Sequence, residues 1–417
     1  MCGNLLDVKY KSNPSINLKD IFYQRRNPQG SIFNESGVWR FRELLNFCAI
    51  ETDDLDQCSK HLVSLDGAEG RQSKPYHMSK VAKFIGINNE KLMLQPEGYN
   101  PSGSFKDNGM STAVTHAKMV QAKKIICAST GNTSASAGMF AANENMSCDV
   151  YIPEGEIAPG KLSQAYQFGT QLIHVKGNFD DAFSKSLEAA NQSNGYTVNS
   201  INPFRIEGQK TILYRALEFM NWEVPDWIIY PGGALGNTSS CGKAIMELYE
   251  WGWIKKIPRI AVINAEGANT LDILYNGKFE NTELRWDKGE LDVELIERYY
   301  AKMQKDGIRP KTKATAIQIG KPANIIKALR ALEFTNGVVT TVTDNEMLDG
   351  MTIVGLNGFD CEMASGSVPS GIKKLMGNDI IKKDDKIIGI LTGRQKEPLL
   401  PINYHNEPSN LFARPPK

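Results

Sequence analysis

Short apolar runs of strand length alternate with segments of helical periodicity from about residue 100 to residue 391. The first run, 124–128, is followed by a polar turn and an Ala-rich helix pattern. Six further runs are predicted strands: 149–152, 171–175, 196–198, 226–230, 259–263 and 386–391. Strands that alternate with helices indicate parallel sheets joined by right-handed crossovers.

Two sheets fit this length better than one. We therefore predict an α/β protein with two doubly wound, mainly parallel-sheet domains. The predicted parts are an N-terminal segment at 1–99 that packs on the large domain, a small α/β domain at 100–205 and the large α/β domain at 206–417. The charged, weakly periodic segment 275–315 is predicted to be a surface excursion. Ligands of such folds gather at the carboxyl ends of strands, so polar loops after strands are the candidate sites.

The composition excludes several classes of function. Lys and Arg total 48 and Asp and Glu total 47, so the net charge is +1 and no global field attracts nucleic acid or an anionic membrane. No apolar run reaches the length of a membrane span, and the N-terminus lacks the layout of a signal peptide. The seven cysteines are scattered without a CxxC pair, which is typical of reduced thiols. We expect a cytoplasmic enzyme with no nucleic-acid or membrane partner.

One lysine stands out by its position. Lys106 follows a turn of small residues and begins a predicted helix, in the stretch Asn100-Pro-Ser-Gly-Ser-Phe-Lys-Asp-Asn-Gly109. A helix N-terminus carries unpaired N–H groups and the positive end of the dipole, and this field disfavours a charged amine. A neutral amine is what imine formation with an aldehyde requires. The sequence therefore predicts a Schiff-base lysine.

A glycine-rich loop, Pro231-Gly-Gly-Ala-Leu-Gly-Asn237, follows a predicted strand and begins a helix. Closely spaced glycines allow backbone N–H groups to converge on an anion. A tight strand-to-helix turn explains the same pattern equally well. The loop matches neither GxGxxG nor GxxxxGK[ST], so dinucleotide and P-loop interpretations are weak.

A second polar loop, Ser129-Thr-Gly-Asn-Thr-Ser-Ala-Ser136, also follows a strand. A helix N-cap needs one such side chain, whereas this loop contains several hydroxyls and an amide. This surplus favours a site for a carboxylate or a ring hydroxyl.

Further candidates lie after the later strands. Arg205 accompanies Asn199 and Ser200 at a strand end, a set suited to a phosphoryl group, although a lone arginine is more often a solvated or paired surface residue. Lys161, considered by itself, is best explained as a solvated surface lysine. Thr392 ends the last strand, where a threonine is more often structural, but its hydroxyl is able to bond a heterocycle nitrogen.

Taken together, these loops resemble the fold-type II enzymes that use pyridoxal 5′-phosphate (PLP), in the tryptophan synthase beta-like family, and among them the threonine synthases. The resemblance is carried by residues 100–107, the Ser-x-Gly-Asn-Thr loop, 231–237, 199–211 and Ala316-Ile-Gln-Ile-Gly-Lys-Pro322. It covers roughly 95–240 and 315–400. It implies PLP as cofactor, bound between the two domains.

The resemblance also implies residue roles. Lys106 would be the imine partner of the cofactor, Asn132 would contact its ring hydroxyl, and Thr392 would bond its pyridine nitrogen. The remaining roles are the cofactor phosphate loop (Gly232, Gly233, Ala234, Leu235, Gly236 and Asn237), the substrate carboxylate (Ser129, Thr130 and Thr133) and the substrate phosphate (Lys161, Asn199, Ser200 and Arg205).

The chain departs from the family pattern at the rim of the predicted substrate site. Asn108 stands where many members have arginine, and Ala234 where asparagine is frequent. Residues 394–398 replace a usual His-Gly-Leu-Lys-Asp-Pro, and 65–75 replace a compact Gly-Glu-Gly-Asn-Thr-Pro-Leu element. The start, Met1-Cys2-Gly, looks like the end of the zinc ribbon found in some relatives, but one cysteine does not make a four-ligand site, so we expect no metal.

The expected reaction is conversion of O-phospho-L-homoserine and water to L-threonine and phosphate, a γ-elimination followed by β-addition of water. Lys106 would act as the base at Cα. A neutral hydroxyl such as Thr392 is not expected to hold the pyridine nitrogen protonated, as a carboxylate would. Two alternatives are β-elimination or β-replacement on another amino acid, phosphorylated ones included, and a non-catalytic PLP-binding homologue. The sequence also leaves a homodimer open.

Overall fold

The computed structural model describes residues 5–10, 13–26, 31–45, 47, 60–154, 159–177, 179–286 and 290–396. The chain forms two compact units, Met1–Ser73 with Tyr99–Glu218, and Lys74–Gly98 with Phe219–Lys417, which we call the first and second units. Each unit contains one parallel sheet, as the strand and helix pattern predicted.

The first unit contains a four-stranded sheet in the order β4-β3-β2-β5, and all three neighbouring pairs are parallel. Its strands are β2 (Lys124–Ala128), β3 (Ser147–Pro153), β4 (Gln171–Val175) and β5 (Tyr196–Thr197). Its helices are α1 (Leu18–Arg25), α2 (Ile32–Glu35), α5 (Lys106–Met119), α6 (Asn132–Asn143), α7 (Pro159–Gln167), α8 (Phe179–Ser193) and α9 (Pro203–Phe219), with the 3-10 turn η1 (Trp39–Leu44).

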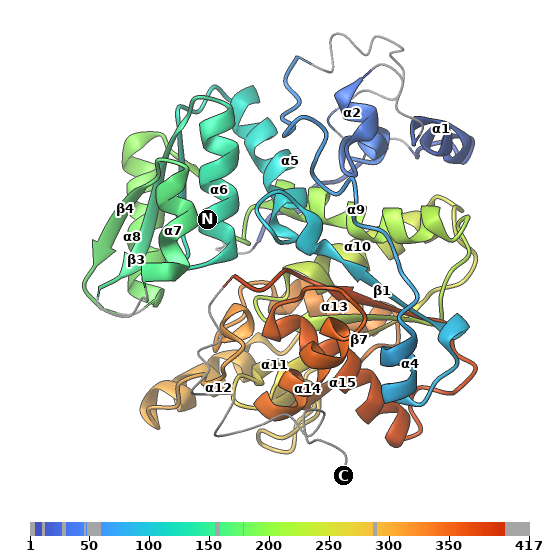
Figure 1. Ribbon diagram of the computed structural model, residues 1–417. Helices are drawn as coiled ribbons and strands as arrows, with labels where there is room; N and C mark the ends of the chain where they lie inside the picture. Colours follow the sequence, from blue (N-terminus) through green and yellow to red (C-terminus); the bar gives the residue numbers. More distant parts are fainter. Residues whose placement is uncertain are drawn as a thin grey trace, which may run out of the picture. The chain divides into compact units, whose positions relative to one another are not determined.

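Alternate residues of β2 pack on opposite faces of this sheet. Ile125 and Cys127 join a buried cluster that includes Met110 and Val114 of α5 and residues of α6. Ile126 and Ala128 join a second cluster that includes residues of α8. Because successive side chains of a strand point to opposite faces, the unbroken apolar run 125–128 requires helices on both sides, and Figure 1 shows helices packed along this sheet.

The second unit contains a five-stranded sheet in the order β1-β9-β6-β7-β8, again with every neighbouring pair parallel. Its strands are β1 (Leu92–Pro96), β6 (Trp227–Gly232), β7 (Arg259–Ala265), β8 (Val338–Val342) and β9 (Ile387–Leu391). Its helices are α4 (Ser79–Ile85), α10 (Gly236–Glu250), α11 (Thr270–Tyr275), α12 (Val293–Lys305), α13 (Ile325–Phe334), α14 (Asp344–Gly355) and α15 (Met363–Gly377), with the turns η2 (Asn89–Lys91), η3 (Glu97–Tyr99) and η4 (Thr315–Ile317).

One large apolar cluster covers a face of this second sheet. It joins Ile229 and Ile263 of the sheet to Val368 and Ile372 of α15 and includes residues of α4 and α14 (Figure 1). Burial of a side chain of this size contributes about 1.5–3 kcal/mol. The carboxyl ends of β6 and β9 lead directly into the polar loops described below, so this core holds those loops in place.

All seven predicted strands are present, within about two residues of their predicted bounds. The strands β1 and β8 were not predicted, and both lie at the edges of the second sheet. The segment 275–315 contains α12, whose residues Leu295, Ile296, Tyr299 and Met303 are buried, so it is more than a surface excursion.

The units divide the chain differently from the predicted boundaries. The segment that ends at Ser73 belongs to the first unit, whereas Lys74–Gly98 belongs to the second. Buried Arg40 donates to Glu218 of α9 at 3.0 Å, and the Trp39 indole donates to the Val63 carbonyl at 2.7 Å. The contact with Glu218 attaches the start of the chain to α9, and hydrophobic periodicity carries no information about such polar contacts.

Among the described residues, no helix is both long enough and apolar enough to cross a membrane.

Candidate active site

Lys106 is the first residue of α5, as the motif predicted. The turn before it is closed by a hydrogen bond from the Gly103 amide to the Asn100 carbonyl at 2.7 Å, and Gly103 has the positive φ of 85° that favours glycine. The Lys106 Nζ lies 3.6 Å from the centre of the Phe105 ring. The side chain is half-buried, so its amine is accessible to a ligand while its backbone is held at the start of the helix.

Asp107, which the sequence reading did not single out, holds this turn. Its fully buried carboxylate accepts hydrogen bonds from the Ser102 amide at 2.7 Å, the Ser102 hydroxyl at 2.6 Å and the Ser136 hydroxyl at 2.6 Å. Charge-assisted bonds of this kind are about twice as strong as neutral ones. The contact to Ser136 links the lysine turn to α6. The two candidate loops of the first unit are therefore joined by a hydrogen bond.

The loop after β2 leads into α6 without a side-chain cap. The N-cap residue is Gly131, and no side-chain oxygen caps the helix there. The Ser129 hydroxyl accepts from the Gly131 amide at 3.2 Å, and the Ser134 hydroxyl donates to the Gly131 carbonyl at 2.7 Å. The predicted ligands in this loop are all half-buried: Ser129, Thr130, Asn132 and Thr133. An uncapped helix N-terminus surrounded by hydroxyls suits a carboxylate.

Asn199 has a defined position beside this loop. Its side-chain amide donates to the Ala128 carbonyl at 2.8 Å and its oxygen accepts from the Ala128 amide at 3.0 Å. The side-chain amide of Asn199 thus pairs with the backbone of Ala128, just past the last backbone pair between β2 and β5. Asn199 therefore holds the last residue of β2, from which the Ser129 loop begins.

The other candidates for a phosphoryl group differ in their surroundings. Arg205 is 1% exposed, its Nη1 donates to the Val198 carbonyl at 2.9 Å, and its buried Nε has no protein partner. Burial lowers the pKa of its guanidinium to about 10. Ser200 is half-buried, and Lys161 lies in the first turn of α7, with its side chain outside the described part of the structure. The roles of all four residues stay predictions.

In the second unit, the glycine-rich loop connects β6 to α10 as predicted. Three of its carbonyl groups are engaged by other segments. The Asn264 amide donates to the Gly232 carbonyl at 2.8 Å, the Asn324 backbone donates to the Ala234 carbonyl at 3.3 Å, and the Ser239 hydroxyl donates to the Leu235 carbonyl at 2.8 Å. In a trans peptide the following N–H points away from its carbonyl, so each contact directs the next amide away from the group that binds the carbonyl.

The interior of this loop fits a phosphate. A Cβ on Gly232 would lie 2.4 Å from the Asn264 Nδ2, and one on Gly233 would lie 3.1 Å from the Ile317 Cα. The helix α10 has no side-chain cap, and the buried Thr238 Oγ1 at its start has no protein partner. Leu235 at the N-cap has a positive φ of 64°. A tight glycine turn, uncapped amides and a buried hydroxyl without a protein partner are the donor set that a phosphate requires.

Thr392 follows the end of β9 and is 5% exposed. Its hydroxyl lies 2.8 Å from the Oε1 of Glu362 and 3.1 Å from the Ser365 hydroxyl, and its amide donates to the Ser365 Oγ at 2.8 Å. The sequence reading identified Thr392 but neither partner. Both stand at the start of α15 in a stretch of small residues without a motif, so no local signal identified them.

The departures from the family pattern have structural roles where they are described. The Asn108 side chain donates to the Phe105 carbonyl and accepts from Arg215, both at 3.0 Å. Glu69 in the 65–75 segment is fully buried and accepts from the Ser36 and Ser64 hydroxyls, and burial raises its pKa. In the 394–398 segment, residues 397–398 lie outside the described part of the chain.

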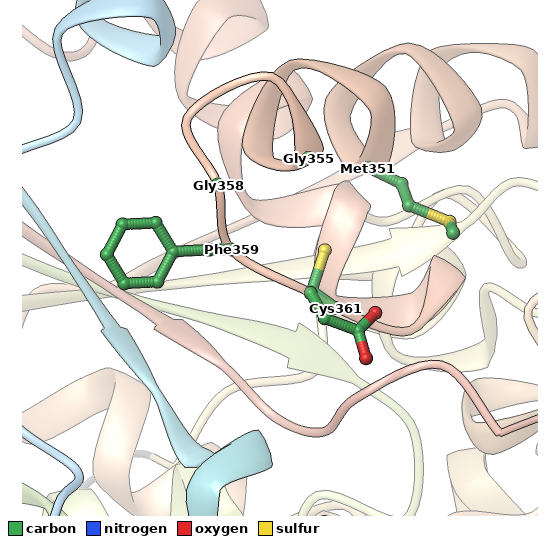
Figure 2. A pocket seen from close by; sticks show the side chains of 6 residues that line it. Met351, Gly355, Gly358, Phe359 and Cys361 are labelled. Atoms are coloured by element: carbon green, nitrogen blue, oxygen red, sulfur yellow. The ribbon is translucent and has the colours of Figure 1, made fainter.

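A separate pocket of about 310 Å³ lies in the second unit between the end of α14 and the start of α15. Figure 2 shows Met351 reaching it from α14, while Phe359 and Cys361 come from the following loop. None of the predicted site residues lines it. Burial raises the pKa of the Cys361 thiol, so this pocket offers no reactive thiolate.

Comparison with known proteins places these features in context. The family described as Pyridoxal-phosphate dependent enzyme matches residues 72–393. The threonine synthase of Methanocaldococcus jannaschii is 36% identical over 415 residues, which are 98% of this chain and 91% of that protein. The threonine synthase of Methanosarcina acetivorans is 34% identical over 81% of this chain and 78% of its own.

Solved structures agree on the fold. Maize serine racemase has a TM-score of 0.60 at 16% identity and covers 78% of this chain and 89% of its own. The processed form of threonine deaminase isoform 2 from Solanum lycopersicum has a TM-score of 0.60 at 14% identity, with 97% and 96% covered. At these identities the similarity concerns the fold alone.

Proposed function

Because this chain belongs to the family of pyridoxal-phosphate-dependent enzymes, we propose that it is a threonine synthase, which converts O-phospho-L-homoserine and water to L-threonine and phosphate. The observation that carries this proposal is the 36% identity with a threonine synthase over 98% of the chain. The position of Lys106 at the start of α5 supports it.

The residues of each unit have distinct tasks toward the cofactor. From the first unit, Lys106 attaches it and Asn132 contacts its ring hydroxyl. From the second, the loop 232–237 holds its phosphate and Thr392 contacts its ring nitrogen. When bound, the cofactor supplies an aldehyde for attachment to an amine and a ring that withdraws electrons from the substrate.

The substrate carboxylate is held by the hydroxyls of Ser129, Thr130 and Thr133 beside the uncapped start of α6. Asp107 and Asn199 keep that loop in register with the lysine turn. A preorganised set of donors costs no rearrangement when the substrate binds. We assign to these residues the task of orienting the substrate's Cα toward the lysine.

Proton movement is assigned to Lys106. Its Nζ takes the proton from the substrate's Cα and serves the later proton shifts at Cβ that precede loss of the γ-phosphate. Water then adds at Cβ. Lys161, Asn199, Ser200 and Arg205 are proposed to bind the departing phosphate, and burial strengthens the field of Arg205 because less solvent screens it.

A product assay tests the function. The purified protein with PLP is incubated with O-phospho-L-homoserine, and phosphate and threonine are measured, with serine and threonine as control substrates. Equal amounts of phosphate and threonine support the proposal. Turnover of another amino acid without turnover of O-phosphohomoserine replaces it with β-elimination or β-replacement chemistry, and a protein that binds PLP but turns over nothing is the non-catalytic homologue.

We also propose a cytoplasmic location, because the four described cysteines are free and buried, as in proteins of reducing compartments. Cell fractionation tests this. A homodimer stays a prediction that sedimentation equilibrium decides.

A further inference from the structure

One buried arginine of the first unit contacts the helix that begins with Lys106. Arg215 of α9 is 2% exposed, and its Nη1 donates to the Oδ1 of Asn108 on α5 at 3.0 Å. The Nη1 also donates to the Gly37 carbonyl at 3.0 Å, and the Nε donates to the Ser73 carbonyl at 3.2 Å. No step of the proposed reaction uses Arg215.

Asn108 extends this contact to the peptide bond that precedes Lys106. Its Nδ2 donates to the Phe105 carbonyl at 3.0 Å, and its backbone amide donates to the same carbonyl at 3.2 Å. A guanidinium only donates and a carbonyl only accepts, so the two partners of the Asn108 side chain determine its orientation. Because a carbonyl and the following N–H lie in one plane, these bonds fix the peptide plane from which Lys106 departs.

The beginning of the lysine turn, residues 100–106, is held beside the same arginine. The Gly70 amide donates to the Asn100 Oδ1 at 2.8 Å. A Cβ on Gly70 would lie 2.5 Å from the Arg215 Nη1 and 3.0 Å from the Asn108 Oδ1. All of these residues belong to the first unit. The lysine turn is therefore attached at both ends to groups that pack around one guanidinium.

We propose that Arg215 is a positioning residue for Lys106, acting through the Asn108 side chain and the Phe105 carbonyl. The inference rests on the proposed function in one respect, the assignment of Lys106 as the amine that attaches the cofactor. In that attachment the amine nitrogen forms a double bond to the aldehyde carbon, and the aldehyde oxygen leaves as water. A fixed peptide plane restricts the directions open to the amine, so less conformational freedom is lost when it attacks.

Two substitutions interrupt this connection at different points. Arg215→Met removes every donor of the arginine and keeps an apolar chain. Asn108→Asp keeps an oxygen that accepts from Arg215, but it replaces the N–H that the Phe105 carbonyl receives by a second oxygen. Thr211→Val is the matched control, because it removes another acceptor of Arg215, at 3.1 Å, that lies on α9 itself and not on the lysine turn.

Two measurements read the position of the lysine. Hydrogen–deuterium exchange of the apoprotein, followed by mass spectrometry, reports the backbone of residues 101–106 without the cofactor. Rapid mixing of the apoprotein with PLP reports the rate at which the visible absorption of the attached cofactor appears. In Arg215→Met and Asn108→Asp the turn should exchange faster, and attachment should be about tenfold slower, as expected for one lost hydrogen bond. Thr211→Val should stay within about twofold of the native chain in both measurements.

Steady-state kinetics with O-phospho-L-homoserine adds a third readout. The kcat of Arg215→Met and Asn108→Asp should fall about tenfold while KM changes less than about twofold, because neither residue is assigned a contact with the substrate. If Arg215→Met does not fold, Asn108→Asp decides the test.

A native rate of attachment in Asn108→Asp, or an equally slow one in Thr211→Val, overturns the inference. Faster exchange with unchanged attachment also overturns it, because the role of Arg215 would then be structural alone. Slower attachment in both variants, in a protein that releases no phosphate from O-phosphohomoserine, upholds it and removes the proposed substrate instead. A native chain that attaches no PLP at Lys106 overturns both the inference and the proposed function.

Discussion

The candidate loops of the two units are built in opposite ways. In the first unit the proposed ligands Ser129, Thr130, Asn132 and Thr133 are half-buried, and the buried Asp107 accepts a hydrogen bond from Ser136 at the end of the same polar stretch. In the second unit most of the loop is buried, with Leu235 at 3% exposure, and it is held by its backbone carbonyls.

The difference fits what the loops of each unit are proposed to bind. A cofactor phosphate stays in place through every turnover, so a rigid backbone cradle serves it. A substrate enters and leaves in every turnover, and Lys106 is proposed to exchange its bond with the cofactor for a role as a base. Accessible side chains on a fixed scaffold suit both tasks better. The comparison predicts that the first unit is most sensitive to removal of a functional group from a side chain. The second unit is predicted to be most sensitive to substitutions that change the shape of its loop.

The largest effect is expected from Lys106→Ala. Turnover and the visible absorption of the attached cofactor should both disappear, because no other amine is assigned to the attachment. The fold should persist, since the side chain is half-buried at the first position of α5. Absorption, phosphate release and circular dichroism measure this. Lys118→Ala on the same helix, which loses a surface ion pair with Glu144, is the control and should retain activity.

Asp107→Ala should destabilise the first unit by about 3 kcal/mol, because three hydrogen bonds to a buried carboxylate are lost and their donors are left without that partner. Urea unfolding of the protein measures this. Ser136→Ala removes one of the three bonds and should cost about 1 kcal/mol. Equal effects of the two substitutions would contradict a central role of the carboxylate.

Gly232→Ala should weaken PLP binding about tenfold to a hundredfold, because overpacking costs about 1–3 kcal/mol and the new Cβ lies 2.4 Å from the Asn264 amide that holds the loop. Fluorescence titration of the apoprotein with PLP measures the affinity. Gly233→Ala, whose nearest neighbour is 3.1 Å away, should weaken binding less. The reverse order would show that Asn264 does not set the shape of the loop.

The smallest effect is expected from Thr238→Val. It removes a buried hydroxyl that has no protein partner, so the apoprotein should be as stable as before or slightly more so. PLP affinity should fall about tenfold if this hydroxyl bonds the phosphate. Ser240→Ala, whose hydroxyl donates to the Asn237 carbonyl at 3.0 Å, is the control and should alter stability more than affinity. Unchanged affinity in Thr238→Val would remove Thr238 from the cradle.

The strand pattern predicted every strand of the first sheet and the central strands of the second sheet, but not the two edge strands of the second sheet. The runs that became β2, β3, β6, β7 and β9 are mostly apolar and almost wholly buried, as expected for parallel strands with helices on both faces. The missed strands β1 and β8 lie at the edges of the second sheet, and β8 is only partly buried. The assignment of the chain up to Ser73 to the first unit also escaped prediction, since it depends on long-range contacts such as that of Arg40 with Glu218.

The sequence by itself determined where the candidate residues lie in the fold: a lysine at the first turn of a helix, two polar loops at strand ends and a threonine after the last strand. Small residues and glycines at those places leave a local pattern that can be read directly. The tertiary structure alone decided what surrounds them, because Asn264, Asn324 and Glu362 reach their partners across about 30 to 90 residues of chain. Such contacts depend on how the sheet brings segments together, and single side chains of ordinary polar type leave no local pattern that would identify them.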